Sequence, residues 1–221
     1  MAKLSYHHGN LRPELIRAGL RAVAEDGPEK LSLRDVARRA GVSAPAVYRH
    51  FEDKDDLLAA IATDCADRLI TLVEAAVASA ADTPIERFRA TGIALVRFAV
   101  AHPEHFRVLA LRGVADRAPP ELFAKVDAWF ADQRRVLAAA QAADKLTPIP
   151  VDDILLAAAT QAYGLAHLIV EGRLGEVDDA RAVELATKVT NVIGIGLLPR
   201  RQHKPPPPPK PPPPKKKRRS A

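Results

Sequence analysis

The stretch that decides the fold runs from Leu33 to Tyr48 and reads LRDVARRAGVSAPAVY. Within it, Gly41 follows Ala37 by four residues, and Val47 lies six residues beyond Gly41. A small residue lets two helices cross closely, glycine adopts the left-handed turn between them, and valine packs the second helix against the first. This spacing predicts a helix-turn-helix, although an ordinary helical hairpin would also satisfy it.

Signals for helix ends flank this stretch. Ser32 stands three residues before Asp35, a pair that resembles a capping box, and Ser43 is expected to cap the next helix, with Pro45 in its first turn. Asp53 is expected to cap a longer helix. With the apolar periodicity, these signals predict an all-α protein of about nine helices, near residues 11–26, 33–40, 44–50, 54–80, 85–101, 103–112, 120–144, 152–172 and 178–197.

Composition agrees with this fold class and argues against several functions. Aromatic residues make up 5% of the chain, and Cys65, on an apolar helix face, is its one cysteine and is expected in the core. Without a continuous apolar leader or a long uncharged apolar stretch, we expect a cytoplasmic protein with no membrane contact. Without a phosphate-binding loop, a nucleophile elbow or a metal-binding motif, we expect no enzyme activity, no cofactor and no metal site.

Charge is distributed unevenly along the chain. Residues 1–51 carry a net charge of +4, residues 52–199 carry −7, and residues 200–221 carry +9 with no acidic residue. Basic ends around an acidic middle suit a protein that contacts nucleic acid at its ends. The last segment also holds two runs of proline, which favour an extended backbone, so residues 199–221 are expected to form a disordered basic tail.

Residues 31–57, which read LSLRDVARRAGVSAPAVYRHFEDKDDL, resemble the DNA-binding signature of the TetR family of bacterial transcriptional regulators. Tyr48, His50, Phe51, Lys54 and Leu57, in this order, are the most specific part of the resemblance. Two further segments resemble one subgroup of that family. The first is residues 6–12. The second is the pair Tyr163 and His167, which fits a Trp-x-x-x-His-Gly motif except that Tyr163 replaces Trp and Leu168 replaces Gly.

The resemblance implies a homodimeric regulator, most often a repressor, that binds a palindromic double-stranded DNA operator and is released by a small-molecule effector. It implies a DNA-binding domain over residues 1–52, with an arm at 1–10, and a ligand-binding and dimerisation domain over residues 53–198. An alternative is a sequence-indifferent architectural DNA-binding protein, suggested by the basic tail and by the few arginines on the second helix of the motif.

The resemblance and the chemistry of the side chains indicate which residues contact DNA. Arg34 and Arg49 are the candidates for reading bases, because small apolar groups cannot hydrogen-bond to a base edge, although Arg49 could equally be a solvated surface charge. Tyr48, His50 and Lys54 match positions that contact phosphates in the family. Supporting roles are expected for the helix caps Ser32 and Ser43 and for the exposed face of the recognition helix, expected to be Ala44, Pro45, Ala46 and Arg49.

The last two helices are expected to form a four-helix bundle with a second subunit, although a monomer could also cover its own apolar faces. The expected interface residues are Ala158, Ala162, Leu165, Ile169, Leu185, Val189 and Ile193. An effector pocket for a largely apolar or cationic molecule is expected among the middle helices. Its candidate lining is Arg97, Phe98, Phe106, Trp129, Gln161, Tyr163 and His167, of which His167 could instead be a core histidine.

Overall fold

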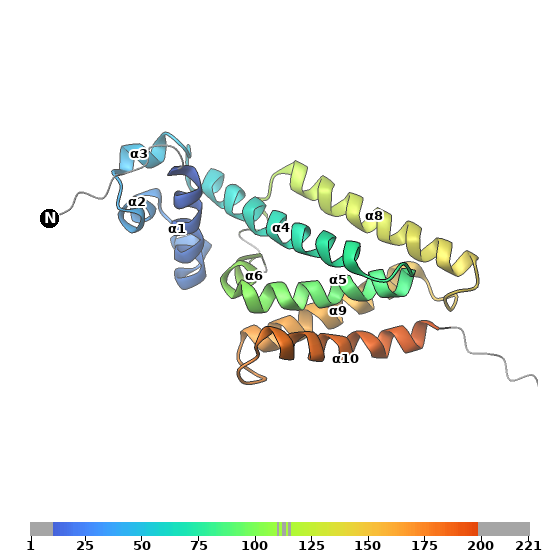
Figure 1. Ribbon diagram of the computed structural model, residues 1–221. Helices are drawn as coiled ribbons and strands as arrows, with labels where there is room; N and C mark the ends of the chain where they lie inside the picture. Colours follow the sequence, from blue (N-terminus) through green and yellow to red (C-terminus); the bar gives the residue numbers. More distant parts are fainter. Residues whose placement is uncertain (1–10, 110, 112–113, 115, 199–221) are drawn as a thin grey trace, which may run out of the picture.

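The computed structural model describes residues 11–198, except 110, 112, 113 and 115. The expected arm at 1–10 and the tail at 199–221 therefore lie outside the described residues. Nine α-helices and one short 3-10 helix, Pro28–Lys30, make up the described chain, which contains no strand (Figure 1). The helices are α1 Leu11–Asp26, α2 Leu33–Ala40, α3 Ala44–Tyr48, α4 Lys54–Ser79, α5 Pro84–Ala101, α6 Pro103–Leu109, α8 Pro120–Ala142, α9 Val151–Val170 and α10 Asp179–Leu197.

The expected helix ends are largely confirmed. The Ser32 hydroxyl accepts a hydrogen bond from the Asp35 backbone N–H at 3.2 Å, and the Asp53 carboxylate accepts from two backbone N–H groups of α4 at 2.8 and 2.9 Å. The prediction for Ser43 was wrong in part. Ser43 occupies the N-cap position of α3, but its side chain makes no capping hydrogen bond. Helix α3 also ends at Tyr48, two residues earlier than predicted.

Helices α1, α2 and α3 pack at one end of the molecule around the start of α4 (Figure 1). Their shared core contains Leu15, Val36, Val47 and Phe51, together with Leu57 from α4, and none of these side chains is more than 1% exposed. The same core continues along α4 through Cys65, which is fully buried as expected. Helix α4 therefore begins within the N-terminal core and leaves it to enter the rest of the molecule.

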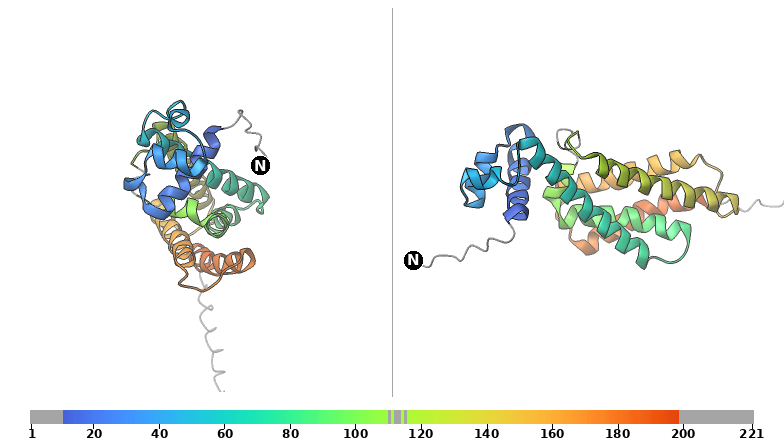
Figure 2. Two further views of the ribbon diagram at one scale, coloured as in Figure 1. Left: turned by 90° about the vertical axis from the view of Figure 1, so that its left-hand side faces the viewer. Right: turned by 90° about the horizontal axis from the view of Figure 1, so that it is seen from above.

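Helix α5 is the central element of the larger C-terminal part, because it packs against α4, α9 and α10 and also contacts α8. The end-on view in Figure 2 shows α9 and α10 side by side at one side of the bundle. By length and composition alone, α9 is the one described helix that could cross a membrane, a test that core helices of water-soluble bundles also pass. Here α9 packs on α5, α8 and α10.

Candidate DNA interface and ligand cavity

The helix-turn-helix is closed by backbone geometry at Gly41. Its φ of 68° and ψ of 29° lie in the left-handed region, which glycine enters without steric cost. The turn is completed by a hydrogen bond from the Val42 N–H to the Ala37 carbonyl at 2.9 Å. Val47 is fully buried and holds α3 against α2. The spacing of Ala37, Gly41 and Val47 therefore acts as predicted from the sequence.

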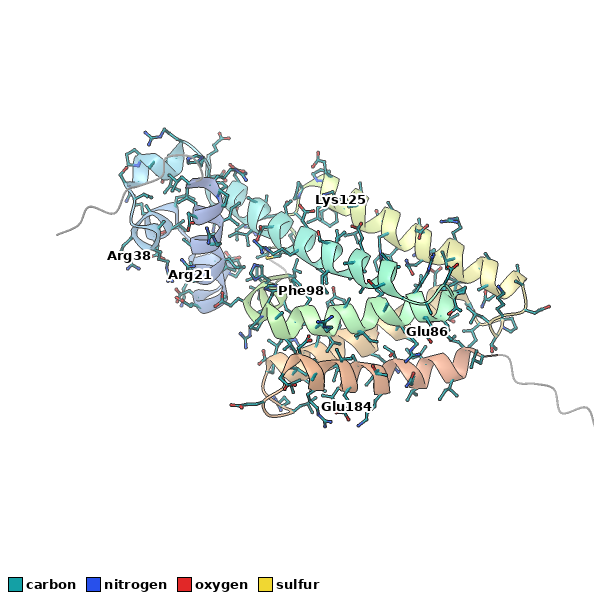
Figure 3. All side chains as sticks on the ribbon, in the orientation of Figure 1. Arg21, Arg38, Glu86, Phe98, Lys125 and Glu184 are labelled. Atoms are coloured by element: carbon teal, nitrogen blue, oxygen red, sulfur yellow. The ribbon has the colours of Figure 1, made fainter. Side chains whose placement is uncertain are left out.

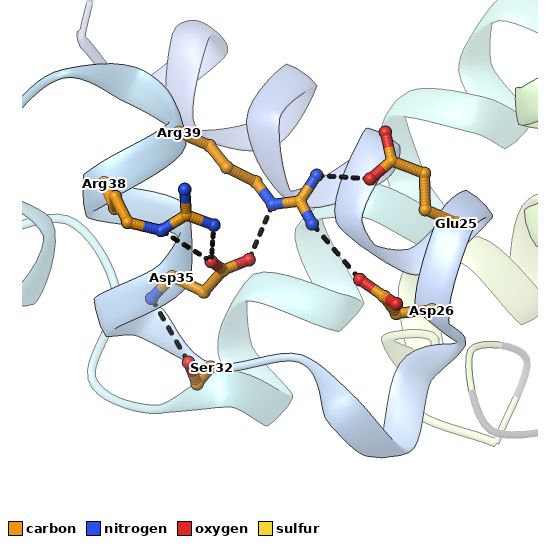
Figure 4. A network of polar contacts seen from close by, with 6 residues as sticks. All are labelled: Glu25, Asp26, Ser32, Asp35, Arg38 and Arg39. Carbon is orange, nitrogen blue, oxygen red and sulfur yellow. Dashed lines mark hydrogen bonds and ion pairs between the residues drawn. The ribbon is translucent and has the colours of Figure 1, made fainter.

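A network of ion pairs fixes α2 to the end of α1 (Figure 4). The Arg39 guanidinium contacts Glu25 at 2.6 Å, Asp26 at 3.1 Å and Asp35 at 2.6 Å. Arg38 donates to the other carboxylate oxygen of Asp35. The hydrogen bonds from Arg39 and Arg38 lower the pKa of Asp35, and the hydrogen bonds that Arg39 donates to Glu25 and Asp35 raise the pKa of Arg39. The network orients α2 and neutralises two of its three arginines.

The third arginine of α2 is left free. Among the described residues, neither Arg34 nor Arg49 has a hydrogen-bond or ion-pair partner, and both side chains are exposed. Arg38, which lies on the same helix (Figure 3), is also exposed but is paired with Asp35. Arg34 and Arg49 therefore have unused donors on the helix-turn-helix, which a base edge or a phosphate would satisfy.

The other predicted DNA-contacting residues divide into exposed and buried groups. Ser32, Ser43, Pro45 and Tyr48 are exposed, whereas Ala44, His50 and Lys54 are partly buried. Ala46 is 7% exposed, so its expected place on the outer face of α3 was wrong. Ala46 turns inward beside Val47, because the five residues of α3 present only a narrow outer face.

A cavity of about 200 Å³ lies between α4, α5, α8, α9 and α10. Its wall is almost entirely apolar and includes the chain's single tryptophan, Trp129, beside Phe130. Of the predicted lining residues, Trp129, Gln161 and Tyr163 are present. Apolar surroundings raise the pKa of the Tyr163 phenol, although about half of this residue is exposed.

Four residues predicted to line the cavity do not. Arg97 pairs with Asp179 at 2.7 Å on the surface, and His167 is exposed. Phe98 and Phe106 are fully enclosed in the core that joins α5, α6, α9 and α10. Sequence analysis missed Phe88, Phe130 and, above all, Arg89, whose charge gave no signal that its helix face would border an apolar cavity.

The residues predicted for the dimer interface face the cavity or the core of the single chain. Ala158, Ala162 and Ile193 line the cavity. The others are buried or pack against the core within one chain, namely Leu165, Ile169, Leu185 and Val189. Since both helices carry apolar residues around most of their circumference, periodicity alone could not show which face meets α5.

The outer side of α9 and α10 carries a different set of apolar residues. Ile195 is 72% exposed, and Leu156 and Val192 are each 68% exposed. Leu168, about half exposed, continues this surface along α9, and the exposed Gly164 and Gly196 lie on the same two helices. Large aliphatic side chains exposed in a group on two adjacent helices indicate a surface that meets another protein.

The described residues include no group of three or more His, Cys, Asp or Glu side chains placed to hold a metal ion. His102 and His105 lie with ring centroids 5.3 Å apart at the junction of α5 and α6. Burial is the main cause that lowers the pKa of His105. These two histidines belong to the packing of this junction, where both rings contact Phe98.

A helix-turn-helix with two free arginines, joined to a larger helical bundle, defines a class of helix-turn-helix DNA-binding proteins. Two family models match the chain, one described as bacterial regulatory proteins of the tetR family over residues 15–61, and one as a tetracyclin repressor-like C-terminal domain over residues 88–189. The chain belongs to the TetR family. It is a DNA-binding transcriptional regulator and not an enzyme.

Relatives agree with this assignment. A transcriptional repressor of Mycobacterium tuberculosis is 33% identical over 113 residues, 51% of this chain and 53% of the relative. The nicotine-responsive repressor HdnoR of Paenarthrobacter nicotinovorans is 39% identical over 59 residues, 27% of this chain and 30% of the relative. The chain thus spans between about a third and a half of the curated relatives that it matches.

Solved structures match over nearly their whole length. A protein of unknown function from Rhodococcus sp. RHA1 has a TM-score of 0.67 at 32% identity, with 89% of this chain and 100% of that chain covered. The ketosteroid regulator KstR2 of M. tuberculosis has a TM-score of 0.67 at 19% identity, with 90% and 100% covered, and shows the likeness of the fold.

Proposed function

We propose that this protein is a homodimeric repressor that binds a palindromic operator through α2 and α3 and releases it when a small molecule enters the cavity. The observation that carries this proposal is the selective pairing of the α2 arginines. Arg38 and Arg39 are engaged by carboxylates, whereas Arg34 and Arg49 keep their donors free on the outer surface of the motif. In this proposal Arg34 and Arg49 read bases, and Tyr48, His50 and Lys54 contact phosphates.

The exposed apolar surface of α9 and α10 supports a dimer. Two copies that cover Leu156, Leu168, Val192 and Ile195 against each other would form a four-helix bundle related by a two-fold axis. A two-fold dimer presents two copies of α3, and therefore recognises two inverted half-sites. The surface lies on the outer side of the bundle, so dimerisation leaves the cavity wall intact.

Helix α4 supplies a physical route from the cavity to the DNA-binding end. Leu69, Ile70 and Val73 line the cavity, while Leu57 near the start of α4 is fully buried in the N-terminal core. Two ion pairs add further links: Lys125 of α8 contacts Asp67 at 2.9 Å, and Arg117 contacts Asp55 at 2.5 Å. A ligand that displaces α4 or α8 would therefore change the separation of the two recognition helices in the dimer. The protein would then have two conformations, one with higher affinity for the operator and one with higher affinity for the ligand.

Selection of bound fragments from a random DNA pool tests the operator part of the proposal. The expected result is an inverted repeat with half-site centres about one helical turn, or a multiple of it, apart. Enrichment of a single asymmetric site, or of no motif, would contradict it.

Sedimentation of Ile195→Asp tests the dimer. A symmetric interface would bury the introduced carboxylate of both subunits, and burial of each unpaired charge is costly. We expect a monomer with weakened operator binding. Phe123→Asp is the matched control, because Phe123 is about half exposed and lies on a different helix, α8. An Ile195→Asp protein that still sediments as a dimer would show that another surface joins the subunits.

A further inference from the structure

Two residues of the cavity wall each have a buried polar atom without a partner. Arg89 Nε and Gln161 Oε1 are both buried, and neither makes a hydrogen bond. Both residues line the otherwise apolar cavity, Arg89 from α5 and Gln161 from α9. A buried donor or acceptor without a partner typically costs about 1–3 kcal/mol, so such groups are rare unless something else satisfies them.

Helices α5, α9 and α10 approach closely at Gly92, which lines the same cavity as these two residues. A Cβ atom added at Gly92, one turn after Arg89 on α5, would lie 3.1 Å from Thr190 Cγ2 and 3.8 Å from the Cβ of Ala162. Arg89 lies one turn before Gly92 on α5 and Gln161 lies next to Ala162 on α9, and all four residues line the cavity.

The charge of Arg89 is already balanced. Its Nη1 contacts a carboxylate oxygen of Glu86 at 2.7 Å, while the side chain as a whole is only 21% exposed. A carboxylate ligand placed against Arg89 Nε would join Glu86 as a second negative charge and would leave a net charge in a largely apolar space. A carboxylate also has no proton to donate to Gln161 Oε1. A cationic ligand, one of the two classes expected from the sequence, would be repelled by the positive charge of Arg89.

We propose that the effector is an uncharged, largely apolar molecule with a hydroxyl group that accepts a hydrogen bond from Arg89 Nε–H and donates one to Gln161 Oε1. A hydroxyl is the smallest neutral group that does both. This inference rests on the ligand-sensing part of the proposed function. A cavity of about 150 Å³ with an apolar lining is known to bind benzene. The cavity of about 200 Å³ is thus of a suitable size for a substituted ring.

Four probes with one ring and one propyl chain isolate each hydrogen bond. 4-Propylphenol can accept and donate, 4-propylanisole can only accept, 4-propyltoluene can do neither, and 4-propylbenzoate carries a charge. Binding is measured without DNA, by calorimetry and by the fluorescence of Trp129, which is the single tryptophan and lies in the cavity wall. The measurement therefore still reports ligand binding if the ligand turns out not to control operator binding.

The expected order of affinity is phenol, then anisole, then toluene, with the phenol at least tenfold tighter than the toluene and than the benzoate. Gln161→Met should remove the difference between phenol and anisole. Arg89→Met should remove the difference between anisole and toluene. The matched controls are Gln133→Met on α8 and Arg87→Met on α5, which make the same substitutions outside the cavity wall and should keep the wild-type order.

Three results would overturn the proposal. The first is equal affinity of the wild-type protein for 4-propylphenol and 4-propyltoluene, and the second is tighter binding of 4-propylbenzoate than of the phenol. The third is no binding of any probe at millimolar concentration. All three are measured on the wild-type protein, so they decide the matter even if a cavity variant fails to fold.

Discussion

Gly19→Ala probes the contact between α1 and α4, which joins the DNA-binding end to the rest of the molecule. A Cβ atom at Gly19 would lie 2.9 Å from Ile61 Cδ1 and 3.2 Å from Leu57 Cδ2. Both side chains belong to α4 and are fully buried. Although the end of Ile61 is flexible, the packed core around it leaves little room to move.

Two opposing effects decide whether Gly19→Ala raises or lowers the free energy of unfolding. Alanine in the interior of a helix is favoured over glycine by about 1 kcal/mol. Adding a methyl group to a packed core typically costs about 1–3 kcal/mol. The contact at 2.9 Å is shorter than real Cβ contacts, so either the Ile61 side chain or the two helices must shift. We therefore expect the variant to lose about 1 kcal/mol of unfolding free energy and to bind operator more weakly, because α1 supports α2.

Urea unfolding followed by circular dichroism measures the change in stability. The control is Ala138→Gly, at an exposed position of α8 outside the cavity wall. There the reverse substitution measures only the preference of a helix for alanine over glycine, without a change in core packing. Ala138→Gly should lose about 1 kcal/mol. A Gly19→Ala protein that is more stable than wild type by a similar amount would refute the packing argument.

Two further predictions concern titratable groups. Because hydrogen bonds from Arg39 and Arg38 lower the pKa of Asp35, its stabilising effect is present above the unfolded value of about 3.9 and is lost as the pH falls through the folded value. Asp35→Asn should therefore lose less unfolding free energy than wild type between pH 7 and pH 3, and an identical loss in both would contradict this. Burial raises the pKa of Cys65 to about 12, so the native thiol should resist a disulfide reagent that labels it in urea, and rapid labelling of the folded protein would contradict its burial.

The sequence predicted those features that depend on local chemistry. The Ser32 cap and the left-handed Gly41 follow from short-range requirements, which any fold with this turn must satisfy. The core positions of Val47 and Cys65 also followed from periodicity, because each lies on a helix with one clear apolar face.

Features that depend on the packing of helices against one another could not be predicted in the same way. Ala162 and Ile193 border the cavity because α9 and α10 turn these faces toward α5, an orientation that is set by neighbours and not by the two sequences. Arg89 is a similar case. A charged residue is normally assigned to the surface, and only the tertiary structure shows Arg89 in the wall of an apolar cavity with its Nε buried.

The central claim is that the outer face of α2 and α3 reads an operator, and matched arginine variants test it most directly. Affinity for the selected operator and for random DNA is measured for Arg34→Ala, Arg38→Ala and Lys54→Ala. A base contact contributes about 1–3 kcal/mol of discrimination, so Arg34→Ala should weaken operator binding by roughly tenfold or more while random DNA is little affected.

Lys54→Ala should weaken binding to both DNAs alike, because a phosphate contact carries no sequence information. Arg38→Ala should leave the ratio of operator to random-DNA affinity unchanged, since its guanidinium is already paired with Asp35. Equal losses on operator and random DNA for Arg34→Ala, or a larger loss of specificity for Arg38→Ala than for Arg34→Ala, would contradict the account.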